Sequence, residues 1–240
     1  MRAVMRGGGL GMNCEVRKKI SVWLKLLTLV SALAGVFLSF VFAKADGYSH
    51  WSKRLLYFTG LSNIWIAVFL IIFLSFYVRG ALKNEKAFKI MYYLRFVFTI
   101  SITVTGIIFC AVLAPFSKNA GYNAWTLSSV LTHVLTPALA IFDFFFDPAR
   151  IELKRRHLYG TTIPLVLYCI FASILILLKV DFGRGDPFPY VFLNFYSPAG
   201  FFGFSNVMPY VFGSFYWLVL IFFLVIGLAK LYAKFYKKTK

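Results

Sequence analysis

Charged residues are scarce in this sequence, and acidic residues are scarcer still. Asp, Glu, Lys and Arg make up 14% of the 240 residues, only 8 residues are Asp or Glu, and 60% are hydrophobic. A soluble domain carries about 25% charged residues. The shortage therefore excludes an ordinary soluble domain and indicates a chain with little mass outside a membrane.

Cysteine is also rare, with 3 residues (Cys14, Cys110 and Cys169) at unpaired spacings. This excludes a disulfide framework and a cysteine-based zinc site, and each thiol is interpreted as a small apolar filler. No His, Asp and Glu cluster has metal-site spacing, and the Gly7-Gly8-Gly9 run lacks a phosphate-loop context. Heptads and internal repeats are absent as well. We expect no metal and no cofactor.

Basic residues, in contrast, are abundant, and the formal net charge is +18. Such a charge can indicate a nucleic-acid partner, but these residues occur in short clusters between apolar runs. Clusters of that kind orient a membrane protein and attract anionic headgroups. The predicted partners are membrane lipids, with no nucleic acid, and the oligomeric state stays open.

Six apolar runs are each long enough to cross a hydrocarbon core of about 30 Å. They cover residues 20–43, 55–78, 90–114, 125–146, 159–178 and 207–229. Ala43-Lys44-Ala45 resembles a signal-peptidase site, but the preceding run exceeds the apolar core of about 7–15 residues in a signal peptide, so we expect a retained helix. Met1 and Met12 both remain possible translation starts.

The expected fold is therefore all-α: a polytopic integral membrane protein with six transmembrane helices in a single transmembrane domain over residues 1–240. Lys and Arg gather before the first span, after the second and fourth, and after the sixth, whereas the alternate loops are poorer in them. The positive-inside rule then places both termini in the cytoplasm, with basic cytoplasmic tails at 1–19 and 230–240. The predicted location is the plasma membrane.

The segment 179–206, between the last two spans, is rich in Pro, Gly, Phe and Tyr. Irregular backbone cannot face lipid unless it is buried in protein or lines a wet cavity. We interpret the segment as an outer cap or a partly re-entrant loop, and an ordinary interfacial aromatic loop is the alternative.

Two polar residues stand at matching depths in the apolar runs. Thr59 lies about 6 Å into the second span and His133 about 12 Å into the fourth, both from the outer side. The two can meet if these spans are neighbours, which predicts a common cavity in the outer half of the membrane. Thr59 could instead bond a carbonyl of its own helix, and His133 could be a structural link between helices. An ionisable group within a membrane is nevertheless a functional candidate.

Other polar residues have supporting or structural interpretations. Asn63 stands one turn after Thr59 and could donate to an oxyanion or hold helices together, and Ser62 is a weaker case of the same kind. Arg95 and Asp143 lie near the inner ends of their spans and are predicted to form a structural ion pair, although Arg95 could instead snorkel to the surface.

Three short motifs resemble the androgen-induced-gene family of six-span membrane proteins and its bacterial relatives. They are Tyr57-Phe58-Thr59 with Ser62-Asn63, then His133 with Pro137 and Asp143, and then Pro189 to Asn194. The resemblance implies a threonine hydrolase of fatty-acid esters that uses Thr59 and His133. The third motif often ends in an acidic residue in that family, whereas this chain has Asn194, and the surroundings of Thr59 also differ from the animal members.

The resulting hypothesis is an intramembrane hydrolase of lipid or fatty-acid esters, with Thr59 as the nucleophile and His133 as its general base. Asp143 is about 15 Å along the helix from His133, too far to orient the imidazole. The alternatives are a transporter or channel-like protein, with His133, Arg95 and Asp143 along its path, and a non-catalytic membrane scaffold. A transporter would be expected to show an inverted repeat, which is absent.

Overall fold

The computed structural model describes residues 13–116, 123–149, 151–183 and 185–238. Within these ranges the regular structure is helical, apart from one isolated antiparallel bridge between Phe204 and Phe212. Six helices are long and apolar enough to cross a membrane. A helix satisfies its backbone polar groups within one segment, as hydrocarbon requires. The chain is an all-α, multi-pass membrane protein.

Two of the six spans contain a π-helical turn, and a third is interrupted between Gly160 and Ile163. In chain order the spans are α1 (Cys14–Val41), α2 (Phe58–Val78), α3 (Glu85–Ile108) with a π-helical turn at Phe109–Leu113 and α4 (Ala114–Phe116), α5 (Leu127–Val130) with a π-helical turn at Leu131–Leu135 and α6 (Thr136–Phe146), α7 (Arg155–Gly160) with α8 (Ile163–Leu177), and α9 (Ser214–Lys238). Short 3₁₀ turns occupy Trp51–Leu56, Ala81–Lys83 and Val191–Leu193.

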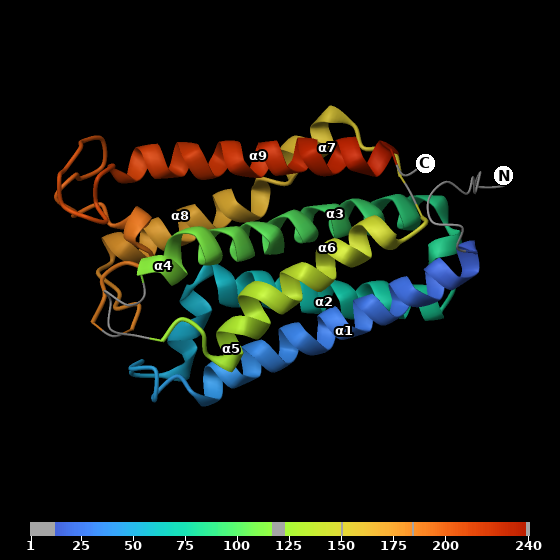
Figure 1. The fold of residues 1–240 in the computed structure, drawn as a ribbon, viewed down its shortest axis with the longest axis horizontal. Helices are drawn as coiled ribbons and strands as arrows, with labels where there is room; N and C mark the ends of the chain where they lie inside the picture. The colour runs from blue at the N-terminus through green and yellow to red at the C-terminus, as the bar shows by residue number, and fades with distance from the viewer. Residues whose placement is uncertain (1–12, 117–122, 150, 184, 239–240) are drawn as a thin grey trace.

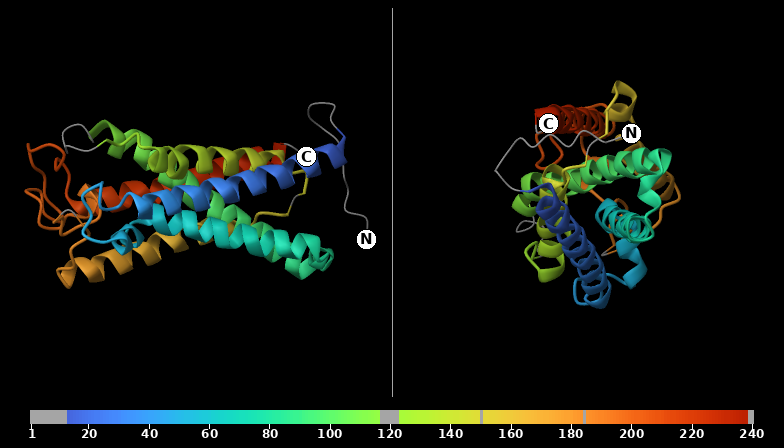
Figure 2. Two further views of the ribbon diagram at one scale, coloured as in Figure 1. Left: turned by 90° about the horizontal axis from the view of Figure 1, so that it is seen from below. Right: turned by 90° about the vertical axis from the view of Figure 1, so that its right-hand side faces the viewer.

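Four of the helices form the centre of the bundle. α1 packs against α2 and α6, and α3 packs against the same two helices. The end-on view in Figure 2 places α3 between α1 and α9. Phe96, Ile100 and Val104 of α3 form a buried cluster with Val225 and Ala229 of α9. The start of α1 and the end of α9 lie at the same end of the bundle (Figure 1).

Two predicted boundaries are wrong. The last span begins at Ser214, seven residues after the predicted 207, because the preceding backbone pairs with itself: Ser205 N–H donates to the Val211 carbonyl and Gly213 N–H to the Gly203 carbonyl. The predicted tails at 1–19 and 230–240 are also partly helical, since α1 starts at Cys14 and α9 runs to Lys238. Asn13 caps α1 by accepting from the Glu15 N–H.

The loop after α8 divides into a buried and an exposed part. Phe182, Tyr190, Phe192 and Leu193 are buried in a cluster with Phe58 of α2 and with α8. Further along the loop, Tyr196, Phe202, Phe204 and Met208 are exposed. The first part is the predicted cap, and it covers the start of α2. The second part has the exposed aromatic character of the interfacial alternative.

Candidate functional site

Thr59 lies in the first turn of α2, the helix capped by Tyr57. A threonine in mid-helix can bond the carbonyl one turn earlier, but for Thr59 that carbonyl lies before the helix begins. The Thr59 Oγ1 is instead 3.1 Å from Nε2 of His133. The alternative in which Thr59 bonds only its own helix is therefore wrong, and the two predicted residues are in contact.

The other ring nitrogen of His133 determines how the imidazole is protonated. Nδ1 lies 3.0 Å from the carbonyl oxygen of Ser129 and 3.0 Å from the hydroxyl of Thr132. A carbonyl can only accept, so the contact assigns the proton to Nδ1 and leaves a lone pair on Nε2. That lone pair points at the Thr59 hydroxyl, which is the arrangement a general base requires. The orienting group that the sequence could not identify is a backbone carbonyl.

Both π-helical turns contribute to this part of the bundle. His133 belongs to the Leu131–Leu135 turn, and its ring stacks on that of Phe109, the first residue of the other π-helical turn, at 4.0 Å between centroids and 21° between planes. A proline follows each turn by two residues, Pro115 and Pro137. Because proline has no N–H, it removes one regular helical bond, and π-helical turns of this kind are frequent at functional sites.

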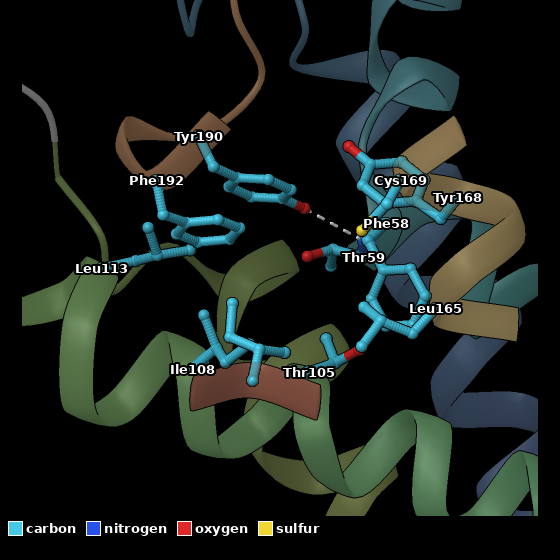
Figure 3. Close-up of a pocket in the computed structure, with 11 residues that line it drawn as sticks. Phe58, Thr59, Thr105, Ile108, Leu113, Leu165, Tyr168, Cys169, Tyr190 and Phe192 are labelled. Carbon is cyan, nitrogen blue, oxygen red and sulfur yellow. Dashed lines mark hydrogen bonds between the residues drawn. The ribbon is translucent and has the colours of Figure 1, made fainter. Parts of the chain in front are cut away.

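A partly open cavity lies beside Thr59, with about 410 Å³ of empty space when its open part is included. Its wall is mostly apolar and comes from α2, α3, α8, α9 and the cap; among its residues are Ile108, Leu165 and Phe192. The Thr59 side chain faces the space between Tyr190 and Ile108 (Figure 3). His133 does not line this cavity, so the prediction that both residues face it is wrong for the imidazole. Instead, the imidazole contacts the threonine from outside the cavity wall.

Asn63 and Ser62 are committed to contacts between helices. Both amide hydrogens of Asn63 are used, because Nδ2 donates to the carbonyls of Thr59 (2.9 Å) and Thr132 (3.1 Å). The Ser62 hydroxyl lies 2.9 Å from that of Thr105 in α3. The predicted role of Asn63 as an oxyanion donor is therefore wrong, and the alternative interpretation as a link between helices holds. These links fix α2 against α3 and the His133 segment.

Tyr190 is a polar residue of the site to which the sequence assigned no role. Its hydroxyl accepts a hydrogen bond from the Thr59 N–H at 3.4 Å, and it lines the same cavity (Figure 3). Burial raises the pKa of Tyr190 to about 12. The Pro189 to Asn194 motif contains Tyr190, and that motif was the only signal for it. Nothing in the sequence showed that this loop folds back onto α2.

The predicted ion pair is present at the other end of the bundle, within a larger cluster. Arg95 contacts Asp143 at 3.1 Å and Asp147 at 2.9 Å. Lys25 of α1 contacts the same carboxylates at 2.8 and 3.0 Å. The contact between Arg95 and Asp143 is confirmed, and Arg95 does not snorkel. Lys25 and Asp147 were missed, although a lysine inside an apolar run and an aspartate one turn after Asp143 were visible signals.

No family model, curated protein or solved structure matches this chain. The interpretation of the site therefore depends on its own geometry. Among the described residues no group of three or more His, Cys, Asp or Glu could hold a metal ion.

Proposed function

We propose that this chain is an intramembrane hydrolase of lipid or fatty-acid esters, with Thr59 as the nucleophile and His133 as the general base. The observation that carries the proposal is the 3.1 Å contact between Thr59 Oγ1 and an imidazole whose other nitrogen is bonded to a carbonyl. A nucleophile and its base need about 2.6–3.2 Å between heavy atoms. The resemblance in motif supports the same pair.

The reaction would proceed in two halves. His133 Nε2 takes the proton of the Thr59 hydroxyl as Oγ1 attacks the ester carbonyl, and the resulting imidazolium returns that proton to the departing alcohol. Water then attacks the acyl-threonine, with His133 again accepting and returning a proton. The Ser129 carbonyl holds the imidazole in the required tautomer throughout.

The cavity supports an acyl substrate. Its lining is apolar apart from a few groups such as the hydroxyls of Thr59, Tyr168 and Tyr190, so an acyl chain can occupy it while the ester lies at Thr59. Thr59 is in the first turn of its helix, near the end of the bundle, where water can reach the acyl-enzyme. We propose that both termini lie in the cytoplasm, following the distribution of Lys and Arg, and that the protein is in the plasma membrane.

A fluorophosphonate probe tests this proposal directly. The purified protein should be labelled at Thr59, and label should be lost in Thr59→Val, which keeps the shape of the side chain and removes its hydroxyl. Thr59→Ser keeps the hydroxyl and is the matched control, expected to retain labelling. A wild-type protein that takes up no label and hydrolyses no p-nitrophenyl acyl ester would overturn the proposal.

The transporter alternative gains no support from the buried charges. Arg95 and Asp143 line a second cavity, of about 240 Å³ of empty space, which shares no residue with the wall of the cavity at Thr59. These charges are paired with one another, and His133 contacts Thr59 at the other end of the bundle. The three residues that a conducting path would use are thus divided between two separate places.

A further inference from the structure

The proposed hydrolysis needs a donor for the negative charge that develops on the ester carbonyl oxygen. Donors aimed at this position are often the largest single contribution to catalysis of acyl transfer. Asn63 cannot serve, because both of its amide hydrogens are bonded to backbone carbonyls. The donor must come from another residue beside Thr59.

Tyr190 lies in the loop after α8, far from Thr59 in the sequence, and its hydroxyl contacts Thr59 in the fold. The cap places its ring over the first turn of α2, with the hydroxyl directed at Thr59 (Figure 3). The oxygen accepts from the Thr59 N–H at 3.4 Å, and the residue is 8% exposed. His133 approaches the same threonine through its Oγ1. Base and phenol therefore both lie against the nucleophilic residue.

The Tyr190 hydroxyl still has a hydrogen that it can donate. Its oxygen accepts from Thr59, so the phenolic hydrogen is left to donate to another acceptor. Tyr168 provides the contrast within the same cavity wall, because its hydroxyl donates to the Leu56 carbonyl at 3.1 Å. Tyr168 is held in a structural bond, whereas Tyr190 presents its hydrogen beside the nucleophile.

The ring of Tyr190 is fixed in place before any substrate binds. It stacks on Phe192 at 4.9 Å between centroids with 9° between planes, and it meets Tyr57 edge-on at 5.7 Å. A donor held in this way needs no rearrangement when charge develops, which is the condition for electrostatic stabilisation of a transition state.

We propose that Tyr190 is a third catalytic residue, and that its O–H binds the oxyanion of the tetrahedral intermediate. This inference depends on the proposed function. As Oγ1 bonds to the carbonyl carbon, the π electrons of the C=O bond move to its oxygen, which accepts a hydrogen bond from the phenol. When the C=O bond reforms, the alcohol leaves with the proton held by His133 Nε2. Tyr190 keeps its own proton throughout.

The protonation state of Tyr190 agrees with this role. Burial raises the pKa of the phenol to about 12, so it remains neutral and able to donate at physiological pH. A phenolate would repel the developing oxyanion instead.

Tyr190→Phe removes the hydroxyl and keeps the ring. Tyr232→Phe is the control, because Tyr232 is also buried, its hydroxyl lies 2.9 Å from that of Thr103 in α3, and it does not line the cavity at Thr59. We expect kcat for a p-nitrophenyl acyl ester to fall about 10²–10³-fold in Tyr190→Phe with little change in KM, as for the loss of one oxyanion donor. The rate of fluorophosphonate labelling should fall as well, because the phosphonyl oxygen occupies the same position. Tyr232→Phe should keep kcat within a few-fold.

A second variant tests the donor without removing it. Trifluorotyrosine at position 190 keeps the ring and a hydroxyl but lowers the pKa of the phenol, so kcat should be lost at a lower pH than in the wild type. A residue with a merely structural role would leave the pH profile unchanged.

The outcomes separate the two proposals. An active wild type in which Tyr190→Phe matches Tyr232→Phe in kcat, or in which the fluorinated tyrosine leaves the pH profile unchanged, overturns the role of Tyr190 and leaves the hydrolase standing. A wild type with neither hydrolysis nor labelling overturns both.

Discussion

The buried polar groups at the two ends of this bundle have opposite arrangements. At one end, Lys25, Arg95, Asp143 and Asp147 are four charged side chains in mutual contact, two of each sign. Ser21 and Tyr92 add hydrogen bonds to the carboxylates. At the other end, Thr59 and His133 meet beside a cavity of about 410 Å³ of empty space.

The difference separates a structural cluster from the proposed catalytic one. Charges in a membrane interior are tolerated when each has a partner, and the charge cluster ties α1, α3 and α6 together in that way. At the Thr59 end, the side chains of Thr59 and Tyr190 line an open space, and His133 contacts Thr59 from outside its wall. Burial of an ionisable residue therefore does not by itself support a catalytic role in this protein; the proposed role depends on the neighbouring empty space and on the direction of the hydrogen bonds.

The strongest test of the comparison is to remove the reactive pair. Thr59→Val and His133→Ala should each lower kcat/KM by a factor on the order of 10⁴ or more, and the double variant should lose no more than either single change, because the pair acts as one unit. The melting temperature in detergent should change little. Independent, multiplicative losses in the double variant would contradict a shared catalytic step.

The next test is to unbalance the charge cluster. Arg95→Met removes a cation that contacts both carboxylates, and breaking a buried pair typically costs about 3–5 kcal/mol of folding free energy. Unfolding measured by denaturant in mixed micelles should show this loss. Lys89→Met, at an exposed pair with Glu85, is the control and should change stability little. Equal stability of the two variants would show that the cluster is not structural.

Restoring neutrality should recover part of that loss. Lys25→Met alone leaves the four-residue cluster with one excess negative charge, and Asp147→Asn removes it. We expect the double variant to be more stable than the sum of the two single effects predicts, with a coupling of about 0.5–3 kcal/mol. A double-mutant cycle on unfolding free energies measures the coupling, and strict additivity would show that the contact of 3.0 Å between Lys25 and Asp147 contributes nothing.

The smallest effect is expected for the hydrogen bonds that join helices next to Thr59. Ser62→Ala removes one interhelical hydrogen bond, to Thr105, and such bonds in membrane proteins contribute about 0.6 kcal/mol on average. Stability should fall by about that amount and kcat should change only a few-fold. A loss of activity as large as that of Thr59→Val would instead assign Ser62 to the chemistry.

Much of the fold could be predicted from the sequence because hydrocarbon imposes a strong local rule. A run such as Phe58–Val78 must be helical to satisfy its backbone, whatever it packs against. The start of α9 could not be predicted equally well, because hydropathy does not distinguish Val207 in a loop from Val219 in a helix. The backbone pairing between residues 203–205 and 211–213 decides that boundary.

The sequence by itself determined the helical spans, and depth along them predicted the pairing of Thr59 with His133 and of Arg95 with Asp143. Each follows from a property of position along a helix, where 1.5 Å per residue converts sequence into depth. Only the tertiary structure decided which groups contact one another. The Ser129 carbonyl contacts the imidazole of His133, and Asn63 donates to two carbonyls. Tyr190 contacts Thr59, and Lys25 lies beside Asp143. These contacts join segments up to 131 residues apart or use backbone atoms that every residue carries, so no local pattern encodes them.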